Sequence, residues 1–212
     1  MPVAALAIVG AVVGLLHIRA SARLLASVRN ETKERSSKLP VWVILFAMVL
    51  GSLTAMLMLQ VDSVPKAVVI TLVTSLTLLQ APLDLATRRL SRPVTLAALA
   101  ILTGVVIVDE FTSNQGDDLL SIALASLLVV LIFAALHWRS PGSLGWGDVL
   151  IAAPLSVSVA SVSVEHVAWW QLMSATSGAV HAMWLRLRRG QGSIPFGPHL
   201  LLSAWLVLVV SV

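Results

Sequence analysis

The sequence contains no cysteine and very little charge. The absence of cysteine excludes disulfide bonds, thiol nucleophiles and cysteine-ligated zinc sites. Charged residues make up 11% of the 212 residues, which is about half their share in ordinary soluble domains. Hydrophobic residues make up 58%. This composition predicts an all-α, polytopic membrane protein, because long apolar runs cross a bilayer as helices.

Eight apolar segments approach or reach the length that crosses a bilayer. They cover residues 2–18, 40–61, 66–83, 94–109, 119–137, 149–164, 167–185 and 199–212. We therefore expect about eight transmembrane helices in a single membrane domain over residues 1–212, with the first segment retained as a span.

The charges between these segments alternate in sign along the chain. If residues 19–39 are cytoplasmic, 13 of the 14 Lys and Arg residues fall on the cytoplasmic side and only Lys66 falls outside. The acids on the outer side are Asp62, Asp109, Glu110, Asp117, Asp118 and Glu165. This separation obeys the positive-inside rule. It predicts a multi-pass protein of the cytoplasmic membrane with both termini outside. The net charge of +4 then reflects the orientation of the protein in the lipid bilayer and does not indicate binding to nucleic acid.

Two acids on the cytoplasmic side lie at the ends of apolar segments. Asp84 ends the third segment and Asp148 begins the sixth, and acids at membrane depth usually mark a functional site. Taken singly, each has a structural explanation. Asp148 suits a helix N-cap, and Asp84 suits a helical pair with Arg88. Together they suit an acid–base pair, because two nearby carboxylates favour a state in which one is ionised and the other protonated.

Such a pair can hydrolyse a peptide bond without a metal or a covalent intermediate. The ionised carboxylate takes a proton from water, and the protonated one donates to the peptide carbonyl oxygen. The five histidines show no zinc-binding spacing. We therefore predict neither a metal nor a cofactor.

Three stretches of the sequence resemble motifs of the prepilin peptidases, which are membrane aspartic peptidases of the G-x-G-D type. "GWGDVLIAAPL" resembles the family's G-x-G-D-V-K-L-L-A-A, with Gly145, Gly147 and Asp148 in register. "DLATRRLSRPVTL" resembles D-x-x-x-R-R-I-P-N-x-L-T, with Asp84, Arg88, Arg89 and Thr95 in register. "IPFGPHLLLSAW" resembles I-P-F-G-P-F-L, with Ile194, Pro195, Phe196, Gly197 and Pro198 in register. The resemblance covers roughly residues 80–212.

The resemblance implies an aspartic endopeptidase that removes the basic leader from type IV prepilins or pilin-like proteins. Cleavage would take place at the cytoplasmic face, just before the hydrophobic helix of the substrate. Asp84 and Asp148 would be the catalytic pair, and the other matched residues would support the site. Many family members carry a zinc-binding N-methyltransferase domain after the first span. Residues 19–39 form a short, basic, cysteine-free segment in its place, which implies a peptidase without pilin N-methylation.

Two departures from the family pattern keep other functions open. Residues Leu90, Ser91 and Arg92 replace I-P-N, and Leu150 replaces a frequent lysine. One alternative is therefore an inactive membrane scaffold or assembly factor with the same fold. Another alternative, independent of these departures, is a small proton- or cation-coupled transporter in which Asp84 and Asp148 relay protons or bind a cation, although both acids are expected at one membrane face rather than at its midplane.

Overall fold

A computed structural model describes residues 12–17, 19–20, 23, 41–58, 60–61, 63–112, 118–139, 144–189 and 194–211. Seven helices have defined bounds: α2 (Val41–Leu57), α3 (Val64–Thr87), α4 (Arg92–Thr112), α5 (Asp118–Arg139), α6 (Trp146–Ala160), α7 (Val164–Arg189) and α8 (Gly197–Val210). Residues 12–17 are also helical, while most of the predicted first segment lies outside the described residues. No strand occurs in the described parts of the chain, so the predicted all-α fold is confirmed there.

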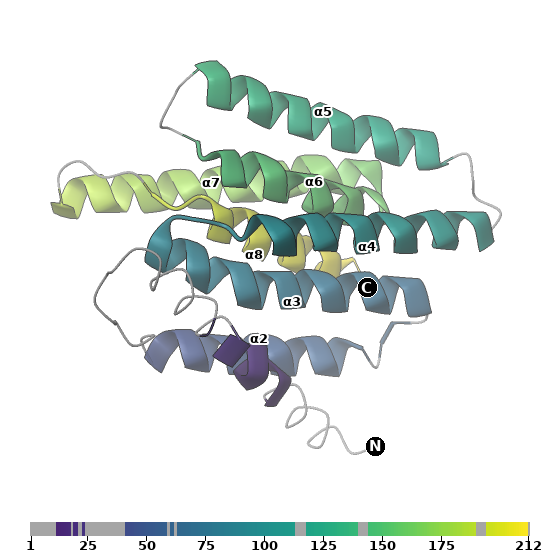
Figure 1. The fold of residues 1–212 in the computed structure, drawn as a ribbon, viewed down its shortest axis with the longest axis horizontal. Helices are drawn as coiled ribbons and strands as arrows, with labels where there is room; N and C mark the ends of the chain where they lie inside the picture. Colours follow the sequence, from purple (N-terminus) through teal and green to yellow (C-terminus); the bar gives the residue numbers. More distant parts are fainter. Residues whose placement is uncertain are drawn as a thin grey trace.

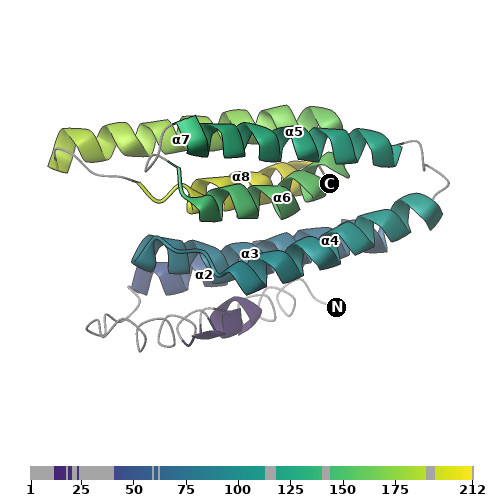
Figure 2. The ribbon, with the colours of Figure 1, turned by 45° about the horizontal axis from the view of Figure 1, so that its top comes forward.

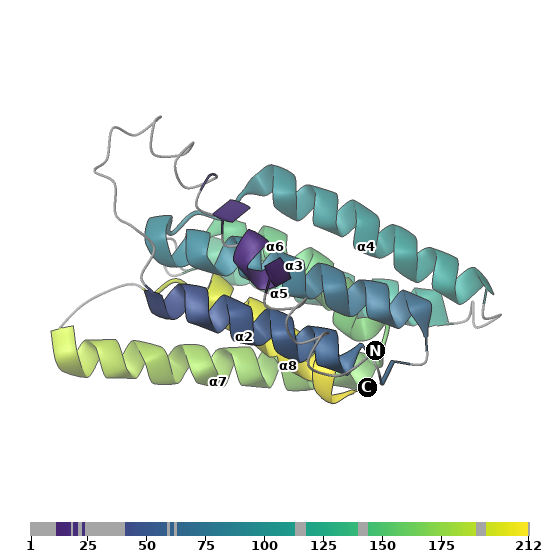
Figure 3. The ribbon, with the colours of Figure 1, turned by 90° about the horizontal axis from the view of Figure 1, so that it is seen from below.

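The helices form three layers that run along a common direction (Figures 1 and 2). α5 and α7 form one outer layer, and α2, α3 and α4 form the other, while α6 and α8 lie between them (Figure 2). Seen from below, α2 lies along α3 and α8 (Figure 3). The indole N–H of Trp205 in α8 donates to the hydroxyl of Thr54 in α2 over 3.1 Å. The middle layer therefore contacts both outer layers, which matters for the site described below.

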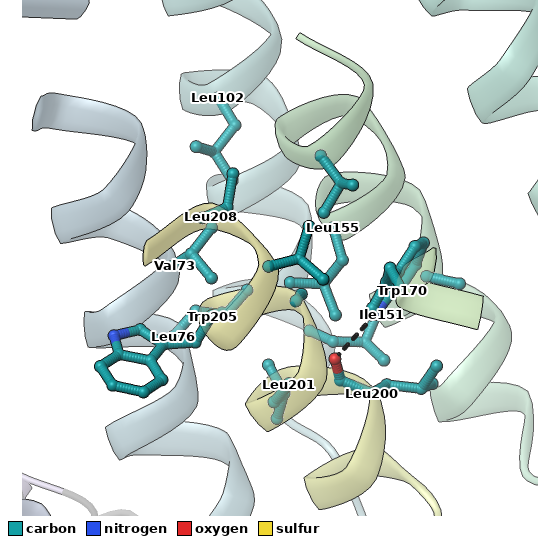
Figure 4. Close-up of a cluster of buried hydrophobic side chains, with 14 of the residues drawn as sticks. Val73, Leu76, Leu102, Ile151, Leu155, Trp170, Leu200, Leu201, Trp205 and Leu208 are labelled. Atoms are coloured by element: carbon teal, nitrogen blue, oxygen red, sulfur yellow. Dashed lines mark hydrogen bonds between the residues drawn. The ribbon is translucent and has the colours of Figure 1, made fainter. Parts of the chain in front are cut away.

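The core lies between α3, α6 and α8 and extends to α4 and α7 (Figure 4). Its largest fully buried side chain is that of Trp170, whose indole N–H donates to the carbonyl oxygen of Leu200 over 2.9 Å (Figure 4). A buried indole needs such an acceptor. The surrounding cluster includes Val73, Leu76, Leu102, Ile151, Leu155, Leu201, Trp205 and Leu208.

Three of the helices, α3, α4 and α5, are long and apolar enough to cross a membrane. Shorter apolar helices occupy Ile44–Leu57, Trp146–Ala160 and Gly197–Val210. The helix bounds follow the predicted segments but often differ from them by several residues. α7 begins before and ends after its predicted segment, because its polar last turn, which includes Arg186 and Arg188, continues the helix beyond the apolar run.

The charges of the bundle gather at opposite ends. α3, α5 and α7 end, and α4, α6 and α8 begin, at the end on the left of Figure 1. That end carries the basic residues Arg88, Arg89, Arg92, Arg139, Arg186 and Arg188. The opposite end carries Lys66 together with Asp109, Glu110, Asp118 and Glu165. The charge separation that was read along the sequence is thus also a separation in space.

Candidate active site

Asp84 lies in the last turn of α3, on a face of the helix that is buried by its neighbours. Its side chain is only 5% exposed. The main-chain N–H of Arg88 donates to the carbonyl oxygen of Asp84 over 2.8 Å and closes the helix. Asp84 is therefore held by regular helical backbone at the basic end of the bundle.

Asp148 lies in the first turn of α6 and is 8% exposed. The sixth apolar segment was predicted to begin at residue 149, but the helix begins at Trp146 and Gly145 is its N-cap. Asp148 is therefore not the N-cap residue. Its Oδ2 accepts the N–H of Gly145 over 3.1 Å, and its own N–H donates to the Gly145 carbonyl over 3.0 Å. This reciprocal pair is a capping interaction, and it fixes the orientation of the Asp148 carboxylate.

Gly197, the first residue of α8, brings the two carboxylates to one place. A Cβ atom added to Gly197 would lie 2.7 Å from Oδ2 of Asp84 and 3.4 Å from Oδ1 of Asp148. Both aspartates therefore face the same glycine, which has room for them because it lacks a side chain. The three segments that resemble the family motifs, far apart in sequence, converge at this point.

One oxygen of the pair is buried without a partner. Among the described residues, Oδ2 of Asp84 has no hydrogen-bond partner although it is inaccessible to solvent. Leaving a buried polar atom unpaired costs about 1–3 kcal/mol, so each such atom in a native structure calls for an explanation. Both the burial and the unpaired oxygen set Asp84 apart from an ordinary surface acid.

Gln80 ties α3 to the turn that follows it. Its side chain is 1% exposed; Oε1 accepts the N–H of Ser91 over 2.9 Å, and Nε2 donates to the Ser91 carbonyl over 3.0 Å. Nε2 also lies 3.2 Å from the hydroxyl of Thr95 in α4. Within the turn, Arg88 has a left-handed backbone, with φ of 54°. These contacts set where α3 ends relative to α4.

Leu90, in the same turn, packs against the G-x-G-D segment. A Cβ atom added to Gly147 would lie 3.3 Å from Cβ of Leu90 and 3.5 Å from its Cδ1. Leu90 is the first residue of the segment that departs from the family's I-P-N, and its branched apolar side chain fills the space beside Gly147. Of the other departures, Arg92 is exposed and Leu150 is half-buried.

The start of α8 is anchored on α5 and α7 by Phe196. Its ring lies 6.3 Å from that of Phe133 in α5, measured between centroids. A Cβ atom added to Gly178 in α7 would lie 2.7 Å from the Phe196 ring. Phe196 therefore occupies a notch that only glycine leaves open, and it holds the adjacent Gly197 against the aspartates.

A second anchor joins α7 to α8 through two histidines. Nδ1 of His181 lies 2.9 Å from Nε2 of His199, and Nδ1 of His199 lies 3.1 Å from the hydroxyl of Ser177. His137, at the end of α5, contacts the carbonyl oxygen of Leu144, just before α6, over 2.8 Å. His137, His181 and His199 are thus each in contact with neighbouring groups.

The remaining predicted site residues lie in the same segments as the pair or Gly197 and differ in burial. Pro198 is buried in the first turn of α8, where its missing N–H has no helical partner to lose. Ile194 and Pro195 are half-buried, whereas Arg89 is exposed. Arg88 is close enough to Asp84 for an electrostatic interaction.

The described residues hold no group of three or more His, Asp or Glu side chains that could bind a metal ion. Sequence reasoning missed Gln80, Gly178 and the pair formed by His181 and His199. Only Gln80 gives a signal, as a polar residue one turn before Asp84 in an apolar segment. No family model, no curated protein and no solved structure matches the chain.

Proposed function

We propose that the protein is a membrane aspartic endopeptidase of the prepilin peptidase type, with Asp84 and Asp148 as its catalytic pair. The observation that carries the proposal is the approach of both carboxylates to Gly197, at 2.7 Å and 3.4 Å from its Cβ position. A shared location for two buried acids is what general acid–base hydrolysis requires. The resemblance of three converging segments to the family's motifs names the reaction class.

In the proposed reaction, the ionised carboxylate takes a proton from water while the water oxygen bonds to the peptide carbonyl carbon. The protonated carboxylate donates its proton to the carbonyl oxygen. The C–N bond then breaks as the leaving amine takes a proton from the pair, one hydroxyl of the tetrahedral intermediate returns its proton to the other carboxylate as it becomes the carbonyl of the new carboxyl group, and the pair is left with the single proton with which it began. No group outside the pair, the water and the substrate is needed to balance the step.

The membrane placement belongs to the same proposal. We propose a multi-pass protein of about eight spans in the cytoplasmic membrane, with both termini outside. The basic end of the bundle would face the cytoplasm, in keeping with the positive-inside rule. The carboxylates, at the cytoplasmic ends of α3 and α6, would then meet a prepilin where its basic leader joins its hydrophobic helix.

The geometry gives less support to the two alternatives. A transporter would bind its ion or proton near the bilayer midplane, whereas both aspartates lie at one end of the bundle. A scaffold that has lost activity needs a damaged site, and the changed segment at Leu90 still packs against Gly147. Neither alternative explains why Gly197 leaves room for two carboxylates.

The test is cleavage of a co-expressed prepilin by the wild-type protein and by Asp84→Asn and Asp148→Asn, read by mass spectrometry. We expect leader removal by the wild type and an intact leader with either variant, while all three accumulate in the membrane. An intact leader with well-folded wild type across several prepilins, or cleavage that survives both substitutions, would overturn the proposal and favour the scaffold.

A further inference from the structure

A groove runs along the surface of the bundle between α7 and α8, which pack side by side (Figure 3). Its volume is about 550 Å³. The residues that line it change in character along its length. The half toward the basic end of the bundle is lined by Thr176, Ser177 and His199, and the half toward the opposite end by Trp169, Leu172 and Leu206. The groove is therefore polar at one end and mainly apolar at the other.

This change in polarity matches one leaflet of a bilayer. Trp169 and Ser177 are eight residues apart on α7, which is about 12 Å along a helix. One leaflet contributes roughly 15 Å to the hydrocarbon core. In the proposed membrane placement, the polar end of the groove points toward the cytoplasmic interface and the apolar end lies within the hydrocarbon. An amphiphile of the cytoplasmic leaflet therefore fits the groove in one orientation.

A chain of hydrogen bonds closes the polar end of the groove. The hydroxyl of Ser177 donates to the Ser174 carbonyl over 3.1 Å, so its oxygen accepts the N–H at Nδ1 of His199, also over 3.1 Å. Nε2 of the same neutral ring then accepts the N–H at Nδ1 of His181 over 2.9 Å. This order leaves Nε2 of the half-buried His181 as the ring nitrogen that these bonds do not occupy.

Thr176 supplies the groove with a hydrogen-bond donor. Its side chain is exposed, and its hydroxyl makes no hydrogen bond within the described part of the chain. A hydroxyl that faces hydrocarbon has no water to pair with, and leaving it unpaired costs free energy. The ester carbonyl of a lipid at the same depth would accept its proton.

The face of α7 that carries Ser177 and His181 continues to an arginine. Trp184 and Arg188 follow at spacings of three and four residues, which place them on the same helical face. The ring of Trp184 lies 6.3 Å from that of His181, between centroids, and the Arg188 guanidinium lies 4.8 Å from the centre of the Trp184 ring. The Arg188 side chain thus reaches back toward the groove, and it pairs with no carboxylate of the described residues.

The charge at this end of the bundle favours an anionic ligand. The acids of the described residues there are Asp84 and Asp148, and both are buried. The exposed charges at the same end are basic and include Arg92, Arg139, Arg186 and Arg188. Arginines near a membrane surface attract anionic lipids, and tryptophan side chains such as that of Trp184 settle at the level of the headgroups.

We infer that the groove between α7 and α8 binds one anionic glycerophospholipid of the cytoplasmic leaflet. One acyl chain lies along Leu172 and Leu206, an ester carbonyl accepts from Thr176, and the phosphate lies between His181 and Arg188. The inference rests on the proposed membrane placement and not on the peptidase reaction. A helix of another protein or of a second copy would fill the apolar half of the groove, but it would leave the charge of Arg188 without an anion.

Native mass spectrometry of the detergent-purified protein measures the preference for the headgroup, with phosphatidylglycerol and phosphatidylcholine of identical acyl chains as probes. We expect one phosphatidylglycerol to bind about fivefold more tightly than phosphatidylcholine, the ratio that corresponds to ~1 kcal/mol for one arginine at the phosphate. Arg188→Gln should abolish this preference. Arg186→Gln is the matched control, because it removes the same charge from the same helix but lies about 200° around it from Arg188.

Two results of this measurement would overturn the inference. One is equal binding of the two lipids by the wild-type protein. The other is an equal loss of preference in Arg186→Gln and Arg188→Gln, which would assign the effect to the overall charge of the basic end rather than to this groove.

Photo-crosslinking locates the acyl chain. A phosphatidylglycerol with a diazirine in its chain should label the wild-type protein more strongly at Leu172 than at Leu128 in α5, although the two leucines are similarly exposed, at 57% and 59%. Thr176→Trp, which fills the groove, should lower the adduct at Leu172. Val180→Trp should not lower it, because Val180 is 58% exposed and does not line the groove.

Labelling at Leu172 that is no stronger than at Leu128, or that persists in folded Thr176→Trp, would overturn the inference. So would a disulfide between two copies of Thr176→Cys in place of the lipid adduct, since the groove would then be an interface between copies. Because no readout involves cleavage, a protein that binds the lipid but removes no leader refutes only the proposed peptidase function. A protein that removes the leader without preferring the anionic lipid refutes only the lipid site.

Discussion

The sharpest perturbation of the site is a single methyl group at Gly197. In Gly197→Ala, the added Cβ would lie 2.7 Å from Oδ2 of Asp84, although real Cβ atoms essentially never approach another atom within 3.0 Å. The backbone of Gly197 is not in the left-handed region, so the substitution costs space rather than conformational strain. Either the Asp84 carboxylate or the start of α8 must move. Oδ1 of Asp148 lies 3.4 Å from the added Cβ, so this movement also affects the Asp148 carboxylate.

The size of the effect follows from the nature of the contact. Overpacking a buried position costs about 1–3 kcal/mol of stability. Displacement of a catalytic group by a fraction of an ångström to 1 Å lowers the rate up to about 100-fold. We therefore expect Gly197→Ala to remain folded, with a modest drop in its thermal midpoint, and to remove the leader about ten to 100 times more slowly than wild type.

The assay measures single-turnover leader removal together with thermal unfolding in detergent. Gly104→Ala is the matched control, because nothing lies within 4 Å of the added Cβ in α4. It should cleave normally and gain about 0.5–1 kcal/mol from the loss of a helical glycine. Wild-type cleavage by Gly197→Ala, with both aspartate variants inactive, would refute the idea that Gly197 sets the position of the carboxylates.

Substitutions at Gln80, Arg88 and Gly178 probe the supports of the site. Gln80→Leu removes the hydrogen bonds to the main chain of Ser91 and should cost about 1–3 kcal/mol; an unchanged thermal midpoint would contradict this. Arg88→Gly should be about 1 kcal/mol more stable than Arg88→Ala, because only glycine tolerates a left-handed backbone without cost. If both Arg88 variants lose cleavage, the loss is due to the missing positive charge. Equal stability of the two variants would argue against a left-handed backbone with φ of 54° at this position. Gly178→Ala should displace the ring of Phe196, which lies 2.7 Å from the added Cβ, and should therefore slow cleavage. Adding Phe196→Leu to this variant should restore part of the cleavage rate. If the double variant is no faster than the single variant, the notch at Gly178 does not act through the Phe196 ring.

Most of the helix positions could be predicted from apolar runs, because the residues that suit a bilayer also mark where helices form. The ends were less predictable. α6 begins at Trp146 because the main chain of Gly145 and the Asp148 side chain cap each other, and an apolar-run criterion does not register a cap. The apolar run likewise stops short in α7, whose arginines remain helical to Arg189.

The two aspartates and their motifs could also be found in the sequence, but the contacts that hold them could not. Gln80 reaches Ser91 only because the chain reverses between α3 and α4. The fit of Phe196 to Gly178 joins the N-cap residue of α8 to α7, and no spacing rule within one helix predicts it. Such contacts depend on how the layers stack, and hence on the whole bundle rather than on any local pattern.

The residues that depart from the family pattern can be judged by what they contact in the structure, and not only by their residue type. Position 90 keeps a branched apolar side chain, and that side chain fills the space beside Gly147. At position 91 Gln80 holds both the main-chain N–H and the carbonyl of the serine; proline, the family's residue at this position, has no N–H to donate, so the serine makes a hydrogen bond that the family's residue could not. Arg92 is exposed at the start of α4. The changed segment thus preserves the packing behind Asp148 and alters mainly the surface around the site, which is where a difference in substrate preference, rather than a loss of catalysis, would arise.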